Sequence, residues 1–329
     1  MSNHSYSSRT LIALLALPLL GSAGCELELI AEHLPLADGL VYPDRHVAAV
    51  SDNHEHVFIA SAVNGTLNLV STNGTPRDEF SLSDAWRPLG AATYYGPDFE
   101  ASGFWQHNEA ALVLHRNGSI LPWYHHGGEL GFHWAGRIVV PAAPPTVASV
   151  TYNDVDQSRD GVVFVLADES RVDGTAQSRI WRRGLDGSWT SVVGPEKSSA
   201  LAYDQHLDSL TVSYTRTDVR DITLREYGED LSFTRSRTIP DLDEVRDFEV
   251  LAGWFYIGAS ACENASCTER TREFQVRNTS LALSDVVAVE VEAVALDLPP
   301  FPLDLDSNVD VWRAGPAASQ LAEYDVVVP

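Results

Sequence analysis

The sequence predicts an all-β fold, and three observations support this prediction. From about residue 45 onward, short runs of β-branched and aromatic residues alternate with polar ones, which is the two-residue period of a half-buried strand. Gly, Asn and Asp turns separate these runs, and no long amphipathic helical pattern interrupts them. Hydrophobic residues form 44% of the 329-residue chain and charged residues 21%, a composition typical of a folded globular protein.

The same local pattern recurs along this body: a strand, a turn of the Asn-Gly or Asp-Gly kind, and another strand. Clear copies have their turns at Asn73–Gly74, Asn117–Gly118 and Asp186–Gly187, and looser copies follow at Gly228–Asp230 and Asn278–Ser280. A more apolar strand, such as residues 56–60, precedes most copies and is expected to lie deeper in a sheet. The copies recur roughly every 42 to 55 residues, a period typical of four-stranded propeller blades.

Residues 45–329 therefore resemble a β-propeller with six blades; five or seven blades, or a β-sandwich, are the alternatives. In the second copy, we take residues 111–115 as the counterpart of the strands that precede the other turns. The chain ends within a strand pattern, so residues 25–44 are expected to supply a strand that closes the ring. No WD, kelch or Asp-box signature is present, so the pattern indicates no particular propeller family.

The N-terminal segment has the three parts of a signal peptide. Arg9 gives a positive n-region, residues 11–20 form an apolar stretch too short to span a bilayer, and residues 21–24 are small residues suited to cleavage. The ending Ala23-Gly24-Cys25 resembles a bacterial lipobox, which implies removal of residues 1–24 and lipidation of Cys25. Ser22 stands where that family prefers leucine, so cleavage after Ala23 to give a soluble secreted protein is the alternative.

The lipobox resemblance implies a protein of the bacterial cell envelope, held by its lipid at the outer membrane or cell surface. The cysteine count agrees, because lipidation of Cys25 leaves an even pair, Cys262 and Cys267. Their spacing suits a disulfide across a hairpin tip, which the oxidising periplasm would preserve. Metal binding by this pair is the alternative, although no second ligand pair lies nearby in the sequence.

The candidate cation site is a run of oxygen-bearing side chains at alternate positions, Asp154, Asp156, Ser158 and Asp160. Such an arrangement can wrap a hard cation, and the run resembles the calcium loops of some propellers. Arg159 stands where those loops require glycine, so an acidic hairpin tip without Ca²⁺ is the alternative.

The candidate ligand-binding stretch combines imidazole and aromatic side chains with a flexible Gly127–Gly128 pair. Imidazoles beside aromatic rings can line a pocket or bind a transition metal, although the spacing matches no established zinc pattern. The candidate residues are Trp123, Tyr124, His125, His126, His133 and Trp134.

Charge and motifs restrict the function. Acidic residues outnumber basic ones 46 to 22, a formal charge of −24 that disfavours nucleic acid as a partner. The sequence lacks the Gly-x-Ser-x-Gly elbow of serine hydrolases and the His-Glu-x-x-His motif of zinc proteases. Our first expectation is an envelope-anchored binding or scaffold protein that presents its loops to a protein, glycan or small-ligand partner. The alternative is an exported hydrolase or lyase acting on glycans or lactones, with acidic residues at the propeller centre.

Overall fold

The computed structural model describes part of the chain. It covers residues 28–35, 45–49, 56–61, 65–71, 76–94, 110–126, 131–134, 136–195, 197–215, 221–240, 242, 244–251, 253–262, 270–278, 288–294, 303–305, 311–314 and 320–327. Within these residues there is no α-helix, and the only helical element is a single 3-10 turn, η1 (Asp84–Trp86). The predicted signal peptide and Cys25 lie outside the described residues.

The strands form six antiparallel sheets, each formed by strands that follow one another along the chain apart from one N-terminal strand. Sheet I contains β2 (Arg45–Ala49), β3 (His56–Ser61), β4 (Thr66–Ser71) and β5 (Pro76–Ser81). Sheet II contains β6 (Pro88–Thr93), β7 (Ala110–His115), β8 (Ser119–His126), β9 (Gly131–Trp134) and β10 (Ile138–Val139). Sheet III contains β11 (Val147–Gln157), β12 (Val163–Arg171), β13 (Ala176–Arg183) and β14 (Trp189–Gly194).

The remaining three sheets follow the same plan. Sheet IV contains β15 (Ser198–Asp204), β16 (Ser209–Thr215), β17 (Asp221–Gly228) and β18 (Phe233–Pro240). Sheet V contains β19 (Glu244–Leu251), β20 (Trp254–Cys262), β21 (Arg270–Asn278) and β22 (Ala288–Val294). Sheet VI contains β23 (Leu303–Leu305), β24 (Val311–Ala314), β25 (Gln320–Val327) and β1 (Glu28–Pro35).

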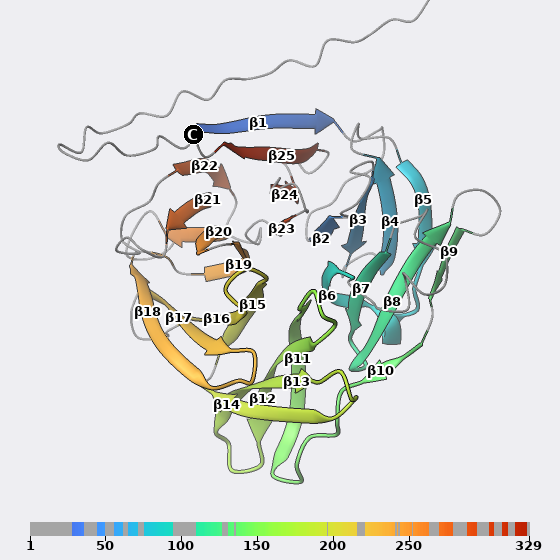
Figure 1. Cartoon of the computed structure of the whole chain (residues 1–329), viewed down its shortest axis with the longest axis vertical. Helices are drawn as coiled ribbons and strands as arrows, with labels where there is room; N and C mark the ends of the chain where they lie inside the picture. The colour runs from blue at the N-terminus through green and yellow to red at the C-terminus, as the bar shows by residue number, and fades with distance from the viewer. Residues whose placement is uncertain are drawn as a thin grey trace, which may run out of the picture.

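The sheets are arranged as blades around a central axis (Figure 1). The first strand of each sheet contacts the first strands of the neighbouring sheets, in the order β2, β6, β11, β15, β19 and β23, and β23 returns to β2. These six strands are therefore the innermost ones, and the ring is closed. The all-β prediction and the propeller architecture are confirmed, and the described strands form six blades.

Sheet VI joins the two ends of the described chain. β1 pairs antiparallel with β25 along its whole length, from Glu28 opposite Val327 to Pro35 opposite Gln320. Three strands from the C-terminal region and one from the N-terminal region thus form one blade. This pairing covers the outer edge of β25, which would otherwise expose unpaired backbone groups.

The second repeat differs from its prediction by one strand. Ala110–His115 is the second strand of sheet II, whereas the corresponding strands before Asp186–Gly187 and before Gly228 are third strands. The Asn117–Gly118 turn therefore joins the second strand to the third, and Gly118 has a φ of +75° there. Because an Asn-Gly turn suits any tight hairpin, its sequence does not indicate which hairpin of the blade it closes.

Each blade has two ends along the axis, which we call the leading and trailing faces. The leading face is where the innermost strands begin, and it carries the turns at residues 116–118 and 172–175. The trailing face is where the innermost strands end, and it carries the turns at residues 158–162, 184–188, 205–208 and 229–232.

The hydrophobic core is divided into layers between successive sheets. Leu112 and Leu114 of sheet II pack with Val163 and Val165 of sheet III, and similar buried clusters join sheets I and II, III and IV, and IV and V. Sheets II, III and IV each lie between two of these clusters, so both of their faces are apolar. This explains why the second strand of each repeat is a continuous apolar run rather than an alternating one.

The innermost strands are linked by carboxylates that accept backbone N–H groups of the next sheet. Asp154 Oδ2 on β11 accepts the N–H of Leu201 on β15 at 2.9 Å, and Asp156 Oδ2 accepts the N–H of Tyr203 at 2.6 Å. Asp204 Oδ2 on β15 makes a related contact by accepting the N–H of Gly253, in the turn between β19 and β20 of sheet V, at 2.8 Å. We call these three contacts the axial latches.

The latches match the geometry of a strand edge. Every second N–H of a strand points to the same side, so Leu201 and Tyr203 present their N–H groups together on the edge of β15 that has no partner strand in sheet IV. Two aspartates also two residues apart on β11 meet them. A buried N–H without a partner costs about 1–3 kcal/mol, so each latch removes a substantial penalty.

A buried histidine of sheet II, His115, binds the 3-10 turn η1 that connects sheet I to sheet II. Trp86 carbonyl lies 2.6 Å from His115 Nδ1, and Trp123 Nε1–H donates to His115 Nε2 at 3.1 Å. A carbonyl only accepts and an indole N–H only donates, so His115 is neutral with its proton on Nδ1. Burial lowers the pKa of His115 to about 4, and the bond to Trp86 opposes that shift only in part.

We predict that replacing one latch carboxylate destabilises the ring. In Asp154→Asn the single amide oxygen cannot accept both the Val155 and the Leu201 N–H groups, so the free energy of unfolding should fall by about 1–3 kcal/mol in urea. Asp160→Asn, at an exposed turn position, is the matched control and should change stability by less than about 0.5 kcal/mol. Equal effects of the two substitutions would contradict the latch.

We predict that His115 makes the protein acid-sensitive. Between pH 6.5 and about 4 the unfolded chain binds a proton that the folded His115 excludes, so stability present above pH 6.5 is lost as the pH falls, by about 3 kcal/mol in total. In His115→Gln the unfolding free energy should depend less on pH across this window. His206→Gln, at an exposed position, should retain the wild-type slope, and a retained slope in His115→Gln would refute the assignment.

Candidate functional site

A polar cluster lies between the innermost strands of sheets III and IV, and we call it the Ser198 cluster: Asn153, Asp168 and Ser198. Ser198 Oγ donates to Asp168 Oδ1 at 2.8 Å and accepts from Asn153 Nδ2 at 3.0 Å. The backbone of Ser198 is held by the same two side chains, because its N–H donates to Asp168 Oδ1 and its carbonyl accepts from Asn153 Nδ2. The serine is thus fixed by four hydrogen bonds.

Local structure explains how these residues meet. Ser198 is the first residue of β15, at the leading face, and Asn153 lies on the neighbouring innermost strand β11. Asp168 lies on β12 opposite Thr151 of β11, so its side chain can reach across to sheet IV. The cluster therefore lies beside the central axis, toward the leading face, with residues from two blades.

Two oxygens of the cluster are available to a ligand. Asp168 Oδ2 and Asn153 Oδ1 accept no hydrogen bond from the described residues, and neither is among the buried atoms that lack a partner. Thr151, opposite Asp168, is exposed. A fixed carboxylate with one open oxygen, next to an amide oxygen, can accept a proton or a substrate hydroxyl.

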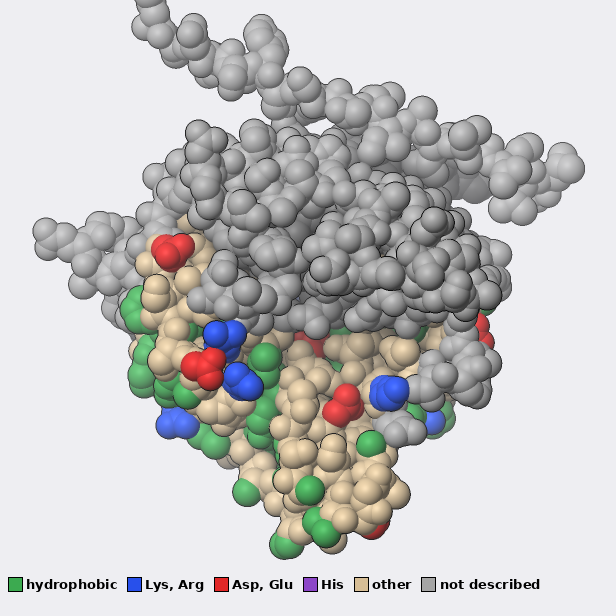
Figure 2. All heavy atoms as spheres, turned by 180° about the vertical axis from the view of Figure 1, so that it is seen from behind, with side chains coloured by type: hydrophobic (Ala, Val, Ile, Leu, Met, Phe, Trp, Pro, Cys, Tyr) green, Lys and Arg blue, Asp and Glu red, His purple; other side chains and the backbone are tan. Residues whose placement is uncertain are grey.

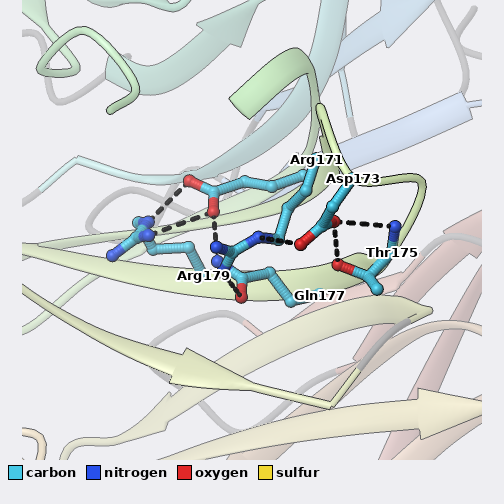
Figure 3. Close-up of polar contacts among 6 residues, drawn as sticks. Arg171, Asp173, Thr175, Gln177 and Arg179 are labelled. Carbon is cyan, nitrogen blue, oxygen red and sulfur yellow. Dashed lines mark hydrogen bonds and ion pairs between the residues drawn. The ribbon is translucent and has the colours of Figure 1, made fainter. Parts of the chain in front are cut away.

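The neighbouring residue on β12 starts a separate network that stiffens the same blade (Figure 3). Arg179 contacts both oxygens of Glu169, at 2.6 and 3.0 Å, and Gln177 Nε2 donates to Glu169 at 2.6 Å. Arg171 continues the network to Gln177 and to Asp173 in the turn at residues 172–175. These contacts hold the leading end of sheet III, which carries Asp168.

Electrostatics differ between the two acids in this part of the blade. Burial opposes ionisation of Glu169, which is 1% exposed at its side chain, but hydrogen bonds from Arg179 and Gln177 and the charges of Arg179 and Arg171 hold its pKa below the usual range. Glu169 is therefore an ionised, fully paired structural group. Asp168, by contrast, has no arginine partner among its hydrogen bonds.

The calcium candidates occupy strand and turn positions of β11. Asp154 and Asp156 have both carboxylate oxygens bonded to backbone N–H groups, Ser158 Oγ accepts the N–H of Val162, and Asp160 is exposed in the turn. Burial raises the pKa of Asp156, while the N–H groups of Gln157 and Tyr203 oppose the rise. Within the described residues no three His, Cys, Asp or Glu side chains are grouped for a metal. Calcium binding by these residues stays a prediction.

The aromatic and histidine candidates lie on the outer hairpin of sheet II. Trp123 is buried in a cluster with Leu67 and Leu69 of sheet I and donates to His115 of its own sheet. Tyr124 contacts Tyr94 edge to face. Trp134 is opposite Trp123 on β9 and is 48% exposed. His133 pairs with Tyr124, and His125 and His126 pair with Phe132 and Gly131, at the trailing end of this hairpin. These residues therefore lie on outer strands, separate from the calcium candidates on β11.

The cysteine candidates are only partly covered. Cys262 is the last residue of β20 and pairs with Arg270 at the start of β21, and Cys267 lies in the sequence between these two strands. Residues 263–269 lie outside the described residues, and the disulfide stays a prediction. Cys25 and its lipid also stay a prediction.

Sequence reasoning did not identify Asp168 and Ser198 as site residues. Neither belongs to a motif, and they lie 30 residues apart on different sheets. Asn153 precedes the acidic run, but its partner lies 45 residues further along the chain. The only available signal was the position of Ser198 at the start of an innermost strand, and this requires the correct blade register.

Comparisons with known proteins show the fold. No family model and no curated protein matches the chain. A gluconolactonase from Xanthomonas campestris is 14% identical with a TM-score of 0.57, over 91% of this chain and 90% of its own. A luciferin-regenerating enzyme is 12% identical with a TM-score of 0.57 (89% and 95%), and a streptogramin B lyase is 9% identical with a TM-score of 0.51 (91% and 98%). The chain is therefore similar to β-propeller enzymes in architecture.

Proposed function

We propose that the protein is a propeller enzyme, a hydrolase or lyase that acts on lactone-like or glycan substrates. The observation that supports it is the open oxygen of Asp168, held beside Asn153 at the leading end of the innermost strands. The proteins of similar architecture include a gluconolactonase and a lyase, which favours this reading over a scaffold. The binding or scaffold function expected from the sequence stays a prediction.

The chemistry follows from the positions of the two oxygens. In lactone hydrolysis, water adds its oxygen to the ester carbonyl carbon while Asp168 Oδ2 accepts the proton. The tetrahedral intermediate then breaks the ring C–O bond, and the proton passes from Asp168 to the departing alkoxide, giving a hydroxy acid. The two Ser198 donors on Oδ1 fix the orientation of the carboxylate, and Asn153 Oδ1 accepts a substrate hydroxyl.

We predict that Asp168→Asn abolishes lactone hydrolysis without unfolding the protein. The amide oxygen can still accept from Ser198, but it cannot take a proton, so kcat should fall by about 10²-fold or more at an unchanged Tm. Glucono-δ-lactone and a set of related sugar lactones would be assayed by acid release with a pH indicator.

Asp173→Asn is the matched control, because Asp173 is an exposed acid on the leading face whose oxygen accepts from Thr175, as an amide also can. It should retain wild-type activity. Absence of hydrolysis and elimination on every lactone and glycan tested with the wild type, or full activity in Asp168→Asn, would exclude the proposal.

Cys25 carries a lipid in this proposal, and the protein acts at the bacterial envelope. The support is the sequence of residues 1–25, a signal peptide that ends in a lipobox-like segment. Among the described residues, no helix is long and apolar enough to cross a membrane. A lipid at Cys25 would give an attachment that does not need one.

We predict that the intact mass of the mature protein equals residues 25–329 plus a diacylglycerol and an acyl chain, less two hydrogens for the Cys262–Cys267 disulfide. Cys25→Ala should leave the protein folded and release it from membranes in a flotation assay. A mature chain that starts at Gly24 without lipid would show instead a soluble secreted protein.

A further inference from the structure

The start of β1 defines where the N-terminal anchor leaves the propeller. Glu28, the first residue of β1, is opposite Val327 at the end of β25. β25 runs in the same direction as the innermost strand of its sheet, because two antiparallel pairings separate them. The chain therefore enters sheet VI at the trailing face, on the outer strand.

The tether between this point and Cys25 is short. Three residue steps separate Cys25 from Glu28 in the sequence. Even a fully extended chain spans at most about 3.5 Å per residue, so the tether reaches about 10 Å. A lipidated Cys25 at the membrane surface would thus hold the trailing end of sheet VI close to the lipid headgroups, whereas a long flexible linker would leave the orientation free.

Exposed apolar side chains lie on the turns of this same face. Leu185 is 67% exposed in the turn at residues 184–188, Leu207 is 54% exposed in the turn at residues 205–208, and Phe233 is 57% exposed just after the turn at residues 229–232. They belong to two adjacent blades, III and IV. Large apolar residues at the tips of turns can insert into the headgroup layer of a bilayer.

The charges of these turns determine how strong such contact can be. Asp186, Asp208 and Asp230 are exposed beside the apolar tips. These acids give the turns little electrostatic attraction for anionic lipid, so membrane contact depends on the lipid at Cys25. On the face of the molecule that Figure 2 shows, the described acidic and basic side chains are interspersed with apolar ones.

We propose that the trailing face lies against the lipid bilayer and that the leading face, with the Ser198 cluster, points away from it. This proposal rests on the lipid anchor and not on the chemistry of Asp168. It makes the innermost-strand site accessible to soluble substrates from the side opposite the membrane. It also assigns Leu185, Leu207 and Phe233 as the residues that contact the headgroup layer.

The test compares one probe position on each face of the lipidated full-length protein. In a Cys262→Ser, Cys267→Ser background, Leu207→Cys reports the trailing face and Val172→Cys, 70% exposed in the turn at residues 172–175, reports the leading face. Each is labelled with bimane and bound to phosphatidylcholine vesicles with or without nitroxide-labelled headgroups. We expect at least twofold stronger quenching at position 207 than at position 172.

Equal quenching at the two positions, or stronger quenching at position 172, would overturn the proposal. Cys25→Ala versions should show no quenching at either position, and quenching that persists there would show membrane binding without the lipid and also overturn it. If the serine background does not fold, amide hydrogen exchange of the wild type gives the same decision: vesicles should slow exchange at residues 205–208 and leave residues 172–175 unchanged. Absence of lipid on the wild type would refute this orientation and leave the Asp168 assay unaffected.

Discussion

The innermost strand of each blade has one edge without a partner strand in its own sheet, and the ring places that edge at the crowded centre of the molecule. Leu201 and Tyr203 on this edge of β15 are buried, so their backbone N–H groups must find acceptors within the protein. Asp154 and Asp156 supply acceptors to β15, and Asp204 supplies one to the turn between β19 and β20 of sheet V. Gly90 helps because a side chain at this position would clash with Asp154, so β6 can approach β11 closely. The arrangement of adjacent blades depends on these contacts.

This constraint also determines which acids remain for chemistry. The three latch aspartates lie where a metal or catalytic site would be sought first, near the axis, yet their described oxygens bind the backbone. Asp168 differs because Ser198 donates hydrogen bonds to its Oδ1 only, and its Oδ2 accepts no hydrogen bond from the described residues. The nearby Glu169 is neutralised by Arg179. A single strand thus carries one acid that stabilises its own blade and one that faces the next blade with an open oxygen.

The sequence predicted the features that are local along the chain. The Asp186–Gly187 turn has a positive φ at Gly187 and an aspartate oxygen that accepts from Ser188, so its hairpin was predictable from turn chemistry alone. The predicted position of the Asn117–Gly118 turn within its blade was wrong, because an Asn-Gly turn can close any hairpin of a blade. The turn joins the second and third strands of sheet II. The latches and the Ser198 cluster join residues 30 to 49 positions apart across two sheets, so no spacing within one segment reveals them. Asp154 and Asp156 were recognised as a paired set, but their partners were not.

Amide hydrogen exchange of the native protein tests the latches most directly. We predict that the N–H groups of Leu201, Tyr203 and Gly253 exchange as slowly as N–H groups paired between strands, because carboxylates bind them in place of a neighbouring strand. Exchange of these three amides at the rate of an exposed turn amide, such as that of Asp186, would show that the carboxylates do not hold adjacent blades together. In that case the axial aspartates would be available as metal ligands or catalytic groups.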